Sequence, residues 1–548
     1  MKHNKNHDNA LAAGPPIGSL CRAFLNALCA VALMELIAGS ARAQATNYIL
    51  GTTNMLVGPS AGSNSAVLGV SPTFGSWTAS ANTSWLALDT NDQTGTGSTN
   101  VIFTYEANSG PTRSGTLTIA GQTVTVTQAG SAYVQAPAFP TIIAESTNVF
   151  VPEGLAMDGA GDVYIADSAH NEVKEWIPTN NTLVTLVSNL DRPSDIAVDS
   201  AGNVYIVVPA NSEVYEWSPI DDSVTTPISI ELSNPYGVAV DQGDNVYIAD
   251  SSDNAIKEWE VVNSNAITIL AGAAQGVINP SSVAVDVAGN VYFADSSPAS
   301  NGFNKIAVNS RRFTILIPGV HEPEGVAVDG SGNVYGADSG HNDLKEWVAA
   351  NGSVTVWPFA AFGVAVDSMQ NIYFSSANTV QELPYAFVDP TPKSEGPSAG
   401  SDSLPPVLPQ TENLLPPFAP ISSQPWLVIT GITNDVISFA FSENDTGTNR
   451  TASIILLGTN VLITQAGTNV VIPPNLSNAL VLSNGVFQFS FANSPNGSFT
   501  VISTTNLAVP FSNWIVAGSV SNLGGGQFQF TSQPATNGTQ MFYSVRSP

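Results

Sequence analysis

The sequence predicts an all-β protein, a six-bladed β-propeller with flanking Ig-like β-sandwich domains. Three observations lead to this fold class. Six copies of a unit of about forty residues fill the middle of the chain. Each copy is rich in β-branched and aromatic runs separated by Gly-Asn turns. Two related segments lie on either side of the copies. A chain of 548 residues is long enough for several such domains.

The first residues read as an export signal. Basic residues, the last of them Arg22, precede an apolar run at 24–38, and residues 41–43 (Ala-Arg-Ala) have the small-x-small pattern that a signal peptidase cleaves. The run is shorter than the ~20 residues that span a bilayer. We therefore predict a signal peptide at 1–43 and no stable membrane insertion after its cleavage. The mature protein is expected to be secreted, periplasmic or at the cell surface.

Composition restricts the chemistry of the mature chain. Cys21 and Cys29 are the two cysteines and both lie in the predicted signal, so disulfides and thiolate sites are excluded after its removal. The whole chain has 15 Lys and Arg against 43 Asp and Glu, and residues 44–548 have 11 against 41. This balance excludes a nucleic-acid partner. It specifies no cofactor, but it leaves calcium or magnesium open because carboxylate-rich loops can hold divalent cations.

The repeats define a predicted propeller domain at 132–387. The consensus unit reads Pro-x-Gly-Val-Ala-Val-Asp, a Gly-Asn turn, Val-Tyr-Ile-Ala-Asp-Ser, and a strand that ends in Lys-Glu-Trp in three copies and in Tyr-Glu-Trp in a fourth. The first strand of each copy ends at an aspartate, namely Asp158, Asp199, Asp241, Asp286, Asp329 and Asp367. Successive aspartates are 41, 42, 45, 43 and 38 residues apart, which is the length of a four-stranded blade.

The sixth copy lacks a fourth strand after Leu383. A strand-like run at Pro140–Ala144 precedes the first copy, where a fourth strand would lie. We predict that this run completes the last blade and closes the ring, because a propeller cannot leave open strand edges exposed.

The repeat pattern resembles the NHL repeat family and also the propeller of the streptogramin lyases. The first resemblance implies a propeller used for binding. The second implies an enzyme with a histidine-centred site, a glutamate and magnesium. In this sequence only His321, Glu322 and Glu324 could imitate that site, so they are the candidate metal ligands.

The flanking segments are related to each other. Residues 58–65 (GPSAGSNS) return as 396–403 (GPSAGSDS), and 126–130 (VTQAG) return as 463–467 (ITQAG). Both copies resemble BACON domains, which are small Ig-like sandwiches of exported bacterial proteins. We therefore predict a BACON-like sandwich at 44–131, a Pro/Ser-rich linker with the start of a second module at 388–420, and a second BACON-like sandwich at 421–468. A further small β-sandwich is predicted at 485–548, without a family.

The candidate ligand-binding residues come from the variable part of one loop of the repeat. The Pro-x-Gly loops of all copies should meet on one face of the ring, and the repeat varies there as a binding surface should. These residues are Glu153, Asp195, Tyr236, Ser281, Glu324 and Phe362. An acidic and aromatic rim could meet a sugar, a peptide or a cationic ligand.

Other chemistry-bearing residues have structural explanations. The repeated aspartates recur in every copy, whereas a catalytic acid should be unique, so we read them as turn formers and assign no catalytic residue. His170 and His341 occupy equivalent loop positions, which favours a structural role. Asp221-Asp222, or Asp250 with Asp253, could hold calcium, but neither has EF-hand spacing. Trp85 and Trp426 match each other and are expected to be core rather than carbohydrate platforms.

Three functions stay open from sequence. The first is an exported multidomain binding or scaffolding protein that uses the propeller loop face for a protein or carbohydrate ligand. The second is a propeller enzyme of lyase or lactonase type with a divalent metal at the channel mouth. The third is a structural cell-envelope protein. We favour the first and expect a binding protein rather than an enzyme, because no unique catalytic constellation is found.

Overall fold

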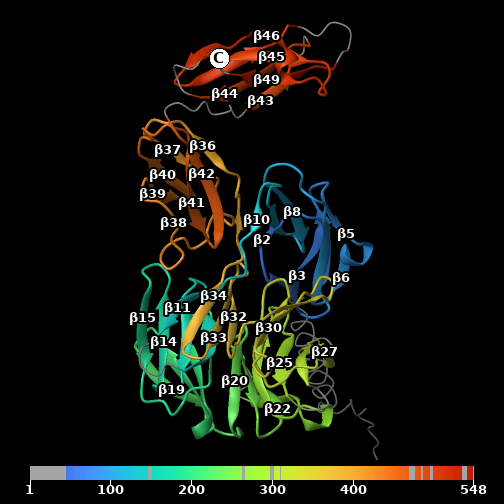
Figure 1. The fold of residues 1–548 in the computed structure, drawn as a ribbon. Helices are drawn as coiled ribbons and strands as arrows, with labels where there is room; N and C mark the ends of the chain where they lie inside the picture. The colour runs from blue at the N-terminus through green and yellow to red at the C-terminus, as the bar shows by residue number, and fades with distance from the viewer. Residues whose placement is uncertain are drawn as a thin grey trace, which may run out of the picture.

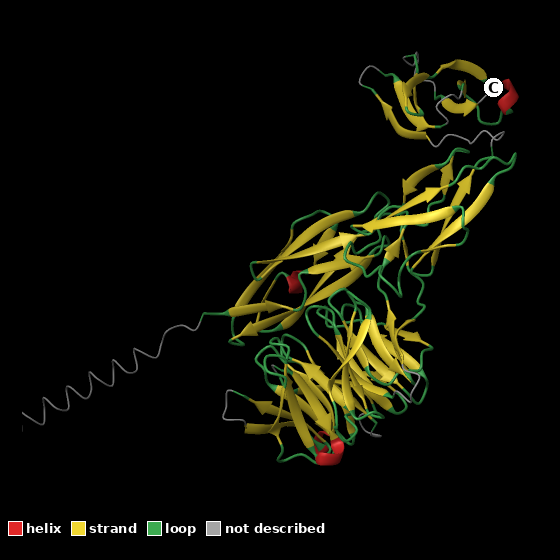
Figure 2. Cartoon of the chain, turned by 90° about the vertical axis from the view of Figure 1, so that its left-hand side faces the viewer, coloured by secondary structure: helices red, strands yellow, loops and turns green. Residues whose placement is uncertain are grey.

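The computed structural model describes residues 45–145, 151–261, 266–296, 301–308, 310–467, 476–482, 485–493, 498–533 and 540–546. The predicted signal peptide at 1–43 lies outside these residues. Strands make up every module, and within the described residues helix occurs only as single 3₁₀ turns, η1 to η4, at Thr90–Asp92, Pro209–Asn211, Ala273–Gln275 and Phe511–Asn513 (Figure 2). The all-β fold class is confirmed. Among the described residues, no helix is long and apolar enough to cross a bilayer.

The N-terminal module consists of two sheets that share one core. The first sheet has the order β1-β3-β7-β5, at Asn47–Leu50, Gly62–Ser71, Thr99–Tyr105 and Leu86–Leu88. The second has the order β2-β9-β8-β4-β6, at Asn54–Val57, Gln122–Gln128, Arg113–Ile119, Ser76–Ala81 and Thr94–Thr96. The alternation of β8 and β9 puts Leu117 and Val126 inward, against Trp77 and Phe103. The two sheets therefore pack as a sandwich.

Six four-stranded sheets follow in the described part of residues 141–383. The first three sheets are β12–β15, β16–β19 and β20–β23. Their strands are Pro152–Met157, Val163–Asp167, Glu172–Ile177 and Thr182–Val187; Asp195–Val198, Val204–Val208, Glu213–Ser218 and Ser223–Ile228; and Pro235–Val240, Val246–Asp250, Ala255–Glu260 and Ala266–Ala271. In each, the Val-Tyr-Ile strand is buried along its whole length, because neighbouring sheets cover both of its faces.

The other three sheets complete a ring. The fourth sheet is β24–β27, at Pro280–Val285, Val291–Asp295, Gly302–Ala307 and Arg312–Pro318. The fifth is β28–β31, at Pro323–Val328, Val334–Asp338, Asp343–Trp347 and Val354–Trp357. The sixth has the order β11-β34-β33-β32, at Thr141–Glu145, Thr379–Leu383, Ile372–Ser376 and Val364–Val366. The first strands β12, β16, β20, β24, β28 and β32 contact one another in cyclic order. The arrangement is propeller-like.

The strand predicted to close the ring is β11. It pairs with β34 in antiparallel register, Thr141 opposite Glu382 and Ile142 opposite Gln381. This pairing is confirmed. Because the sixth sheet takes strands from both ends of the repeat region, the first and last units cannot separate without breaking a ladder.

The repeated aspartates form the turns between the first and second strands. Asp199 Oδ1 accepts hydrogen bonds from the backbone N–H groups of Ala201 (2.9 Å) and Asn203 (2.8 Å), and its Oδ2 accepts one from Asn203 Nδ2 (2.8 Å). Gly202 takes a φ of 85°, which L side chains rarely adopt. The same bonds to backbone N–H groups recur at the other five aspartates. The turn-forming role is thus confirmed.

The second flanking module begins inside the 388–420 segment. Its sheets have the orders β36-β42-β41-β38 and β37-β40-β39, at Lys393–Glu395, Thr459–Gln465, Arg450–Leu456 and Ile421–Ser422, and at Gly400–Ser403, Val436–Phe441 and Leu427–Thr433. The proline-rich stretch between β37 and β38 is packed rather than extended away from the protein, since Leu404, Val407, Leu414 and Phe418 are buried. Residues 393–403 therefore belong to the sandwich itself.

The two flanking modules repeat each other in detail. Strand β2 runs parallel to β9, and β36 runs parallel to β42. Arg113 Nε donates to Gln128 Oε1 at 3.0 Å, and Arg450 Nε donates to Gln465 Oε1 at 2.8 Å. Both glutamines are fully buried. The sequence likeness thus reflects the same local structure.

The C-terminal module is a third two-sheet unit. Its sheets have the orders β43-β44-β48-β47 and β46-β45-β49, at Leu476–Val481, Phe487–Ala492, Gln527–Thr531 and Ser521–Gly524, and at Ile515–Ser519, Thr500–Thr504 and Phe542–Arg546. Its core is aromatic, with Phe489, Phe491, Phe528 and Phe530 buried. The C-terminal module forms a folded unit with a core of its own.

The two flanking modules that repeat each other lie at the same end of the ring (Figure 1). We call this end, where the aspartate turns lie, the turn end. Ser65 Oγ donates to Ser331 O at 2.7 Å, and Val67 N donates to Gly330 O at 3.1 Å. Strand β10 (Val134–Gln135) pairs with β35 (Phe387–Val388), and Tyr133 OH donates to Pro406 O at 3.0 Å. At the opposite end, which we call the mouth, the first strand of each sheet begins.

Candidate ligand-binding site

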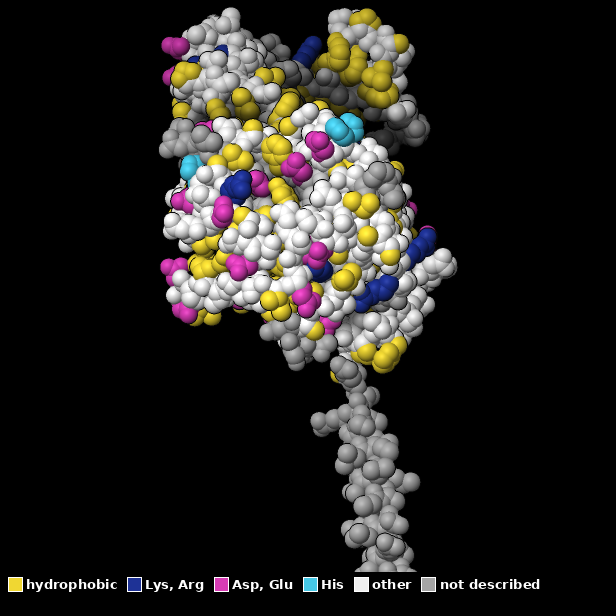
Figure 3. Space-filling model, turned by 90° about the horizontal axis from the view of Figure 1, so that it is seen from below, with side chains coloured by type: hydrophobic (Ala, Val, Ile, Leu, Met, Phe, Trp, Pro, Cys, Tyr) yellow, Lys and Arg dark blue, Asp and Glu magenta, His cyan; other side chains and the backbone are white. Residues whose placement is uncertain are grey.

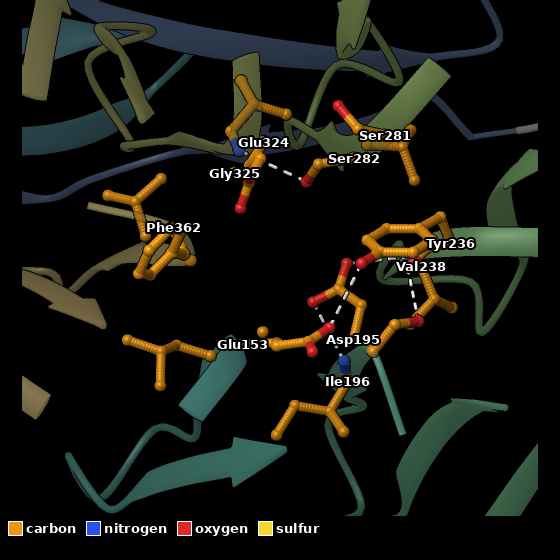
Figure 4. A pocket seen from close by; sticks show the side chains of 17 residues that line it. Glu153, Asp195, Ile196, Tyr236, Val238, Ser281, Ser282, Glu324, Gly325 and Phe362 are labelled. Atoms are coloured by element: carbon orange, nitrogen blue, oxygen red, sulfur yellow. Dashed lines mark hydrogen bonds between the residues drawn. The ribbon is translucent and has the colours of Figure 1, made fainter. Parts of the chain in front are cut away.

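The six sequence-predicted residues come together at the mouth. Each stands at or just before the first strand of its sheet, so the ring symmetry directs all six toward the axis. Together they line one cavity of about 60 Å³ (Figure 4), whose members are Glu153, Asp195, Tyr236, Ser281, Glu324 and Phe362. The cavity has room for a few waters or one small functional group, and not for a sugar ring.

The glycine of the Pro-x-Gly motif allows the first strands to approach closely. A Cβ at Gly363 would lie 2.0 Å from the carbonyl oxygen of Glu153, and one at Gly154 would lie 2.2 Å from Asp195 Oδ1. Any side chain there would force neighbouring sheets apart. The motif therefore holds the variable residues around a narrow opening.

Hydrogen bonds between sheets fix the walls of the mouth. Ser281 Oγ donates to Pro323 O at 2.6 Å, and Ser194 Oγ donates to Tyr236 O at 2.8 Å. Ser375 Oγ donates to Glu153 O at 2.8 Å. Ser281 thus joins the fourth sheet to the fifth. Such bonds leave a preorganised rather than a mobile site.

Three carboxyl groups give the mouth an acidic character. Burial raises the pKa of Asp195 to about 7, although its oxygens accept hydrogen bonds from the backbone N–H groups of Val238 and Ile196. Burial also raises the pKa of Glu153 and of Glu324, and the nearby Glu153 carboxylate raises the pKa of Glu324 further. The mouth is therefore a place where a bound cation would be favoured over water.

Two aromatic rings frame this acidic centre. Tyr236 and Phe362 stand on opposite sides of the mouth (Figure 4). The Tyr236 hydroxyl donates to Glu153 Oε2 at 3.3 Å. An aromatic face beside carboxylates suits an ammonium group, which gains from both the charges and the ring quadrupole. The figure shows Asp195 between Glu153 and Tyr236.

The predicted metal triad does not form. Of the three candidates only Glu324 lines the mouth, whereas His321 and Glu322 are exposed. The His321 ring packs against the His341 ring at 5.5 Å between centroids. Within the described ranges, no three His, Cys, Asp or Glu side chains are grouped so that they could hold a metal ion. His321 and Glu322 precede the strand that directs Glu324 to the axis, so the three side chains do not share one site.

The other acidic candidates for calcium are used internally. Lys257 Nζ donates to Asp250 Oδ2 at 2.7 Å and to Asp253, so this pair holds an ammonium group. Asp222 Oδ1 accepts a hydrogen bond of 2.7 Å from the Trp217 indole. These contacts explain both clusters without a metal ion.

The paired histidines and tryptophans also have structural roles. His170 Nδ1 lies 2.7 Å from Asp167 Oδ2, and His341 Nδ1 lies 2.9 Å from Asp338 Oδ2. Trp85 is 9% exposed and lies under the Arg113 guanidinium, 4.4 Å from it. Its counterpart Trp426 lies under Arg450 at 4.3 Å. Neither ring is a free platform.

A second cavity was not predicted from the sequence. It has a volume of about 200 Å³ at the turn end, between the ring and the N-terminal module. Tyr105, Tyr335, Tyr385 and Glu346 line it, and burial raises the pKa of Glu346 to about 7. These residues come from segments more than 200 positions apart. No local pattern could have assembled them.

Comparison with known proteins gives one family match. Residues 75–129 match the BACON family, described as "Putative binding domain, N-terminal". The match covers a small part of the chain and lies within the N-terminal sandwich. A comparison with curated proteins found no significant match.

Several solved structures are similar to a part of this chain. A streptogramin B lyase is 11% identical, with 46% of this chain and 97% of that chain covered and a TM-score of 0.35. A gluconolactonase from Xanthomonas campestris is 13% identical (46% and 97%, TM-score 0.39). A chain of the nidogen/laminin complex is 18% identical (43% and 98%, TM-score 0.37). At these scores the likenesses carry no argument about function.

Proposed function

We propose that this chain is an exported binding protein whose ring mouth takes a protonated amine, such as a lysine side chain of a protein partner. We interpret the six sheets as NHL-like blades and the two BACON-like modules as Ig-like supports. The single observation that carries the proposal is the convergence of six variable residues, three of them carboxylic acids, on one small cavity.

The size of the cavity favours an amine over a carbohydrate. A volume of about 60 Å³ holds an ammonium head with one or two waters, whereas small-molecule sites usually have several hundred cubic ångströms. The carboxyl groups of Glu153, Asp195 and Glu324 supply charge, and Tyr236 and Phe362 supply aromatic walls. Burial strengthens each charge interaction there.

The position of the mouth also supports binding. The flanking modules pack on the turn end, so they leave the mouth to an external ligand. The ring end of the molecule carries many acidic and few basic side chains (Figure 3). A field of this sign would steer cationic partners toward it and speed their association.

No feature of the described residues specifically favours the alternative function, a lyase or lactonase. A lyase or lactonase with a divalent metal at the mouth needs several ligands on one ion, and the described residues do not group in that way. A purely structural role in the cell envelope gives no reason for acidic residues at a narrow, preorganised opening. We therefore place binding first.

The test is binding of a fluorescent lysine-bearing peptide by the chain without its predicted signal. We expect saturable binding by the lysine peptide and at least tenfold weaker binding by the same peptide with acetylated lysine. Glu153→Gln with Glu324→Gln should weaken binding about tenfold or more, since each lost charge contact is worth roughly 1 kcal/mol or above.

The matched control is Asp221→Asn, which removes an acidic charge at the turn end. It should leave the affinity unchanged. Equal binding of the acetylated peptide, or hits only with neutral glycans on an array, would overturn the amine proposal. Activity on a lactone or depsipeptide that disappears in Glu324→Gln would favour the enzyme.

A further inference from the structure

The C-terminal module differs from the rest of the chain in its charge. Arg546 is the one charged residue in 468–548, whereas residues 44–467 carry all 41 acidic side chains of the mature protein. Two copies of this chain therefore repel each other everywhere except near this module. At physiological salt that repulsion fades within about 8 Å, so a neutral end can approach its copy.

The same module exposes large apolar side chains. Strands β46 and β47 follow each other with one residue between them, and they form edges of the two sheets. They and the turn before them carry the residues that we call the 507–523 face. It comprises Leu507, Phe511, Ile515, Val516 and Leu523, which are 60–66% exposed.

The exposure does not reflect an incomplete core. Phe499 and Val501 are buried with four further aromatic residues between the sheets. Trp514 is 9% exposed, and its indole donates to Val509 O at 3.0 Å. The module thus keeps its indole inside and leaves four aliphatic side chains and the Phe511 ring outside. A carbohydrate surface usually needs several exposed aromatic rings, and this face has one, so it fits a polypeptide better.

The edges have no charged or proline residues to protect them. Natural edge strands are blunted by Lys, by inward charges or by proline, and β46 and β47 contain none of these. A bulge at Ala517 interrupts the pairing of β46 with β45. A partner would therefore contact mainly side chains of the face, with main-chain pairing limited to the start of β46.

We propose that two copies of this chain associate through their 507–523 faces. A self-complementary apolar patch on a neutral module suits a two-fold contact, in which each copy buries the same surface. The pairing holds the two acidic rings away from each other. It places two amine-binding mouths on one particle, although the association does not depend on what the mouths bind.

The experiment is sedimentation velocity of the chain without its predicted signal, from about 1 to about 100 µM. We expect a concentration-dependent shift from monomer to dimer. Ile515→Lys with Leu523→Lys should raise the dissociation constant at least tenfold. The control Ile220→Lys changes a residue of the ring that is 87% exposed and should have no effect. Added salt should strengthen the dimer, because it screens the remaining repulsion.

Hydrogen exchange of the unmodified chain gives a second readout that needs no variant. The amides of β46 and β47 should exchange more slowly at high protein concentration, and those of β12 should not change. The proposal is overturned if the chain stays monomeric over the whole concentration range. It is also overturned if the dimer is unaffected by Ile515→Lys with Leu523→Lys, or if the hydrogen exchange does not depend on protein concentration. Binding of the face to phosphatidylcholine vesicles or cellulose without self-association overturns it as well.

Discussion

The hydroxyl of Tyr236 donates a hydrogen bond of 3.3 Å to Glu153 Oε2, and so joins the third sheet of the ring to the first across the mouth. These two sheets are not neighbours in the ring. The bond therefore spans the opening itself. It holds the Glu153 carboxylate in place and favours its ionised form.

Removing that donor should weaken ligand binding. Tyr236→Phe keeps the ring but removes the hydroxyl, so the pKa of Glu153 should rise further and less of it will be ionised. We expect a fewfold to tenfold loss of affinity for the lysine peptide near pH 6, and a smaller loss near pH 8. Fluorescence polarisation at pH 6 and at pH 8 measures the affinity. An equal loss of affinity at both pH values would show that the hydroxyl does not act through the ionisation of Glu153.

Binding should also depend on pH in the unmodified protein. Burial raises the pKa of Asp195 to about 7 and raises the pKa values of Glu153 and Glu324. As the pH rises from 5 to 8 these groups lose protons, while an amine stays protonated to about pH 10. Affinity should therefore increase over this interval. A flat profile, or one that falls, would contradict a role for these carboxyl groups.

The contact between the ring and the second flanking module should weaken in alkali. Glu382 and Glu412 are buried there, and among the described residues no donor is in hydrogen-bond geometry with the Glu412 carboxyl oxygens. Burial, with nearby Asp367 and Asp435, raises the pKa of Glu412 to about 8. The pKa of Glu382 is raised well above its ordinary value by burial and by Glu412. Both groups are therefore neutral when the module is docked at neutral pH.

The sign of the effect follows from a raised pKa in the folded state. The stability contributed by protonated Glu412 is full below its unfolded pKa of 4.5 and is lost as the pH rises to about 8. The loss is on the order of 3–5 kcal/mol. Thermal unfolding should occur at lower temperature at pH 9 than at pH 6. Glu412→Gln should remove much of the difference between the unfolding temperatures at pH 6 and pH 9. A larger difference in this variant would mean that the Glu412 carboxyl is ionised in the folded state.

The arginine over each module's tryptophan should stabilise both modules alike. Arg113 and Arg450 each contact a glutamine and an indole in the same geometry. Replacing either with alanine should cost its module about 1–3 kcal/mol, since the partner Gln128 or Gln465 is left buried without its donor. Hydrogen exchange of β8 and β9, or of β41 and β42, reports the loss. Arg546→Ala is the control and should change neither.

Much of the ring could be predicted from sequence because its units repeat. A position such as Glu153 can be placed on the mouth once five equivalents are recognised, since symmetry directs equivalent residues to the same place. The closure by β11 could be predicted because the sixth unit visibly lacked a strand. The turn role of Asp199 followed from its recurrence.

Other features depend on contacts that no local pattern encodes. The start of the second module was expected within 388–420, but its first strands, β36 and β37, could not be assigned because a proline-rich stretch follows them. His321 and Glu322 were grouped with Glu324 by their nearness in sequence, yet only Glu324 enters the strand that faces the axis. The packing of Ser65 against Ser331 joins residues 266 positions apart. The exposed 507–523 face depends on β46 and β47 being edge strands of their sheets, and a sequence pattern does not show which strands lie at an edge.

The most direct test of the central claim is covalent capture of an amine at the mouth. A lysine peptide mixed with the protein and a carbodiimide should form an amide with Glu153 or Glu324, detected by mass spectrometry of the digested complex. The account predicts that this amide forms at a low peptide concentration and disappears with acetylated peptide. Coupling only to exposed carboxylates such as Asp221, with Glu153 and Glu324 unmodified, would contradict it.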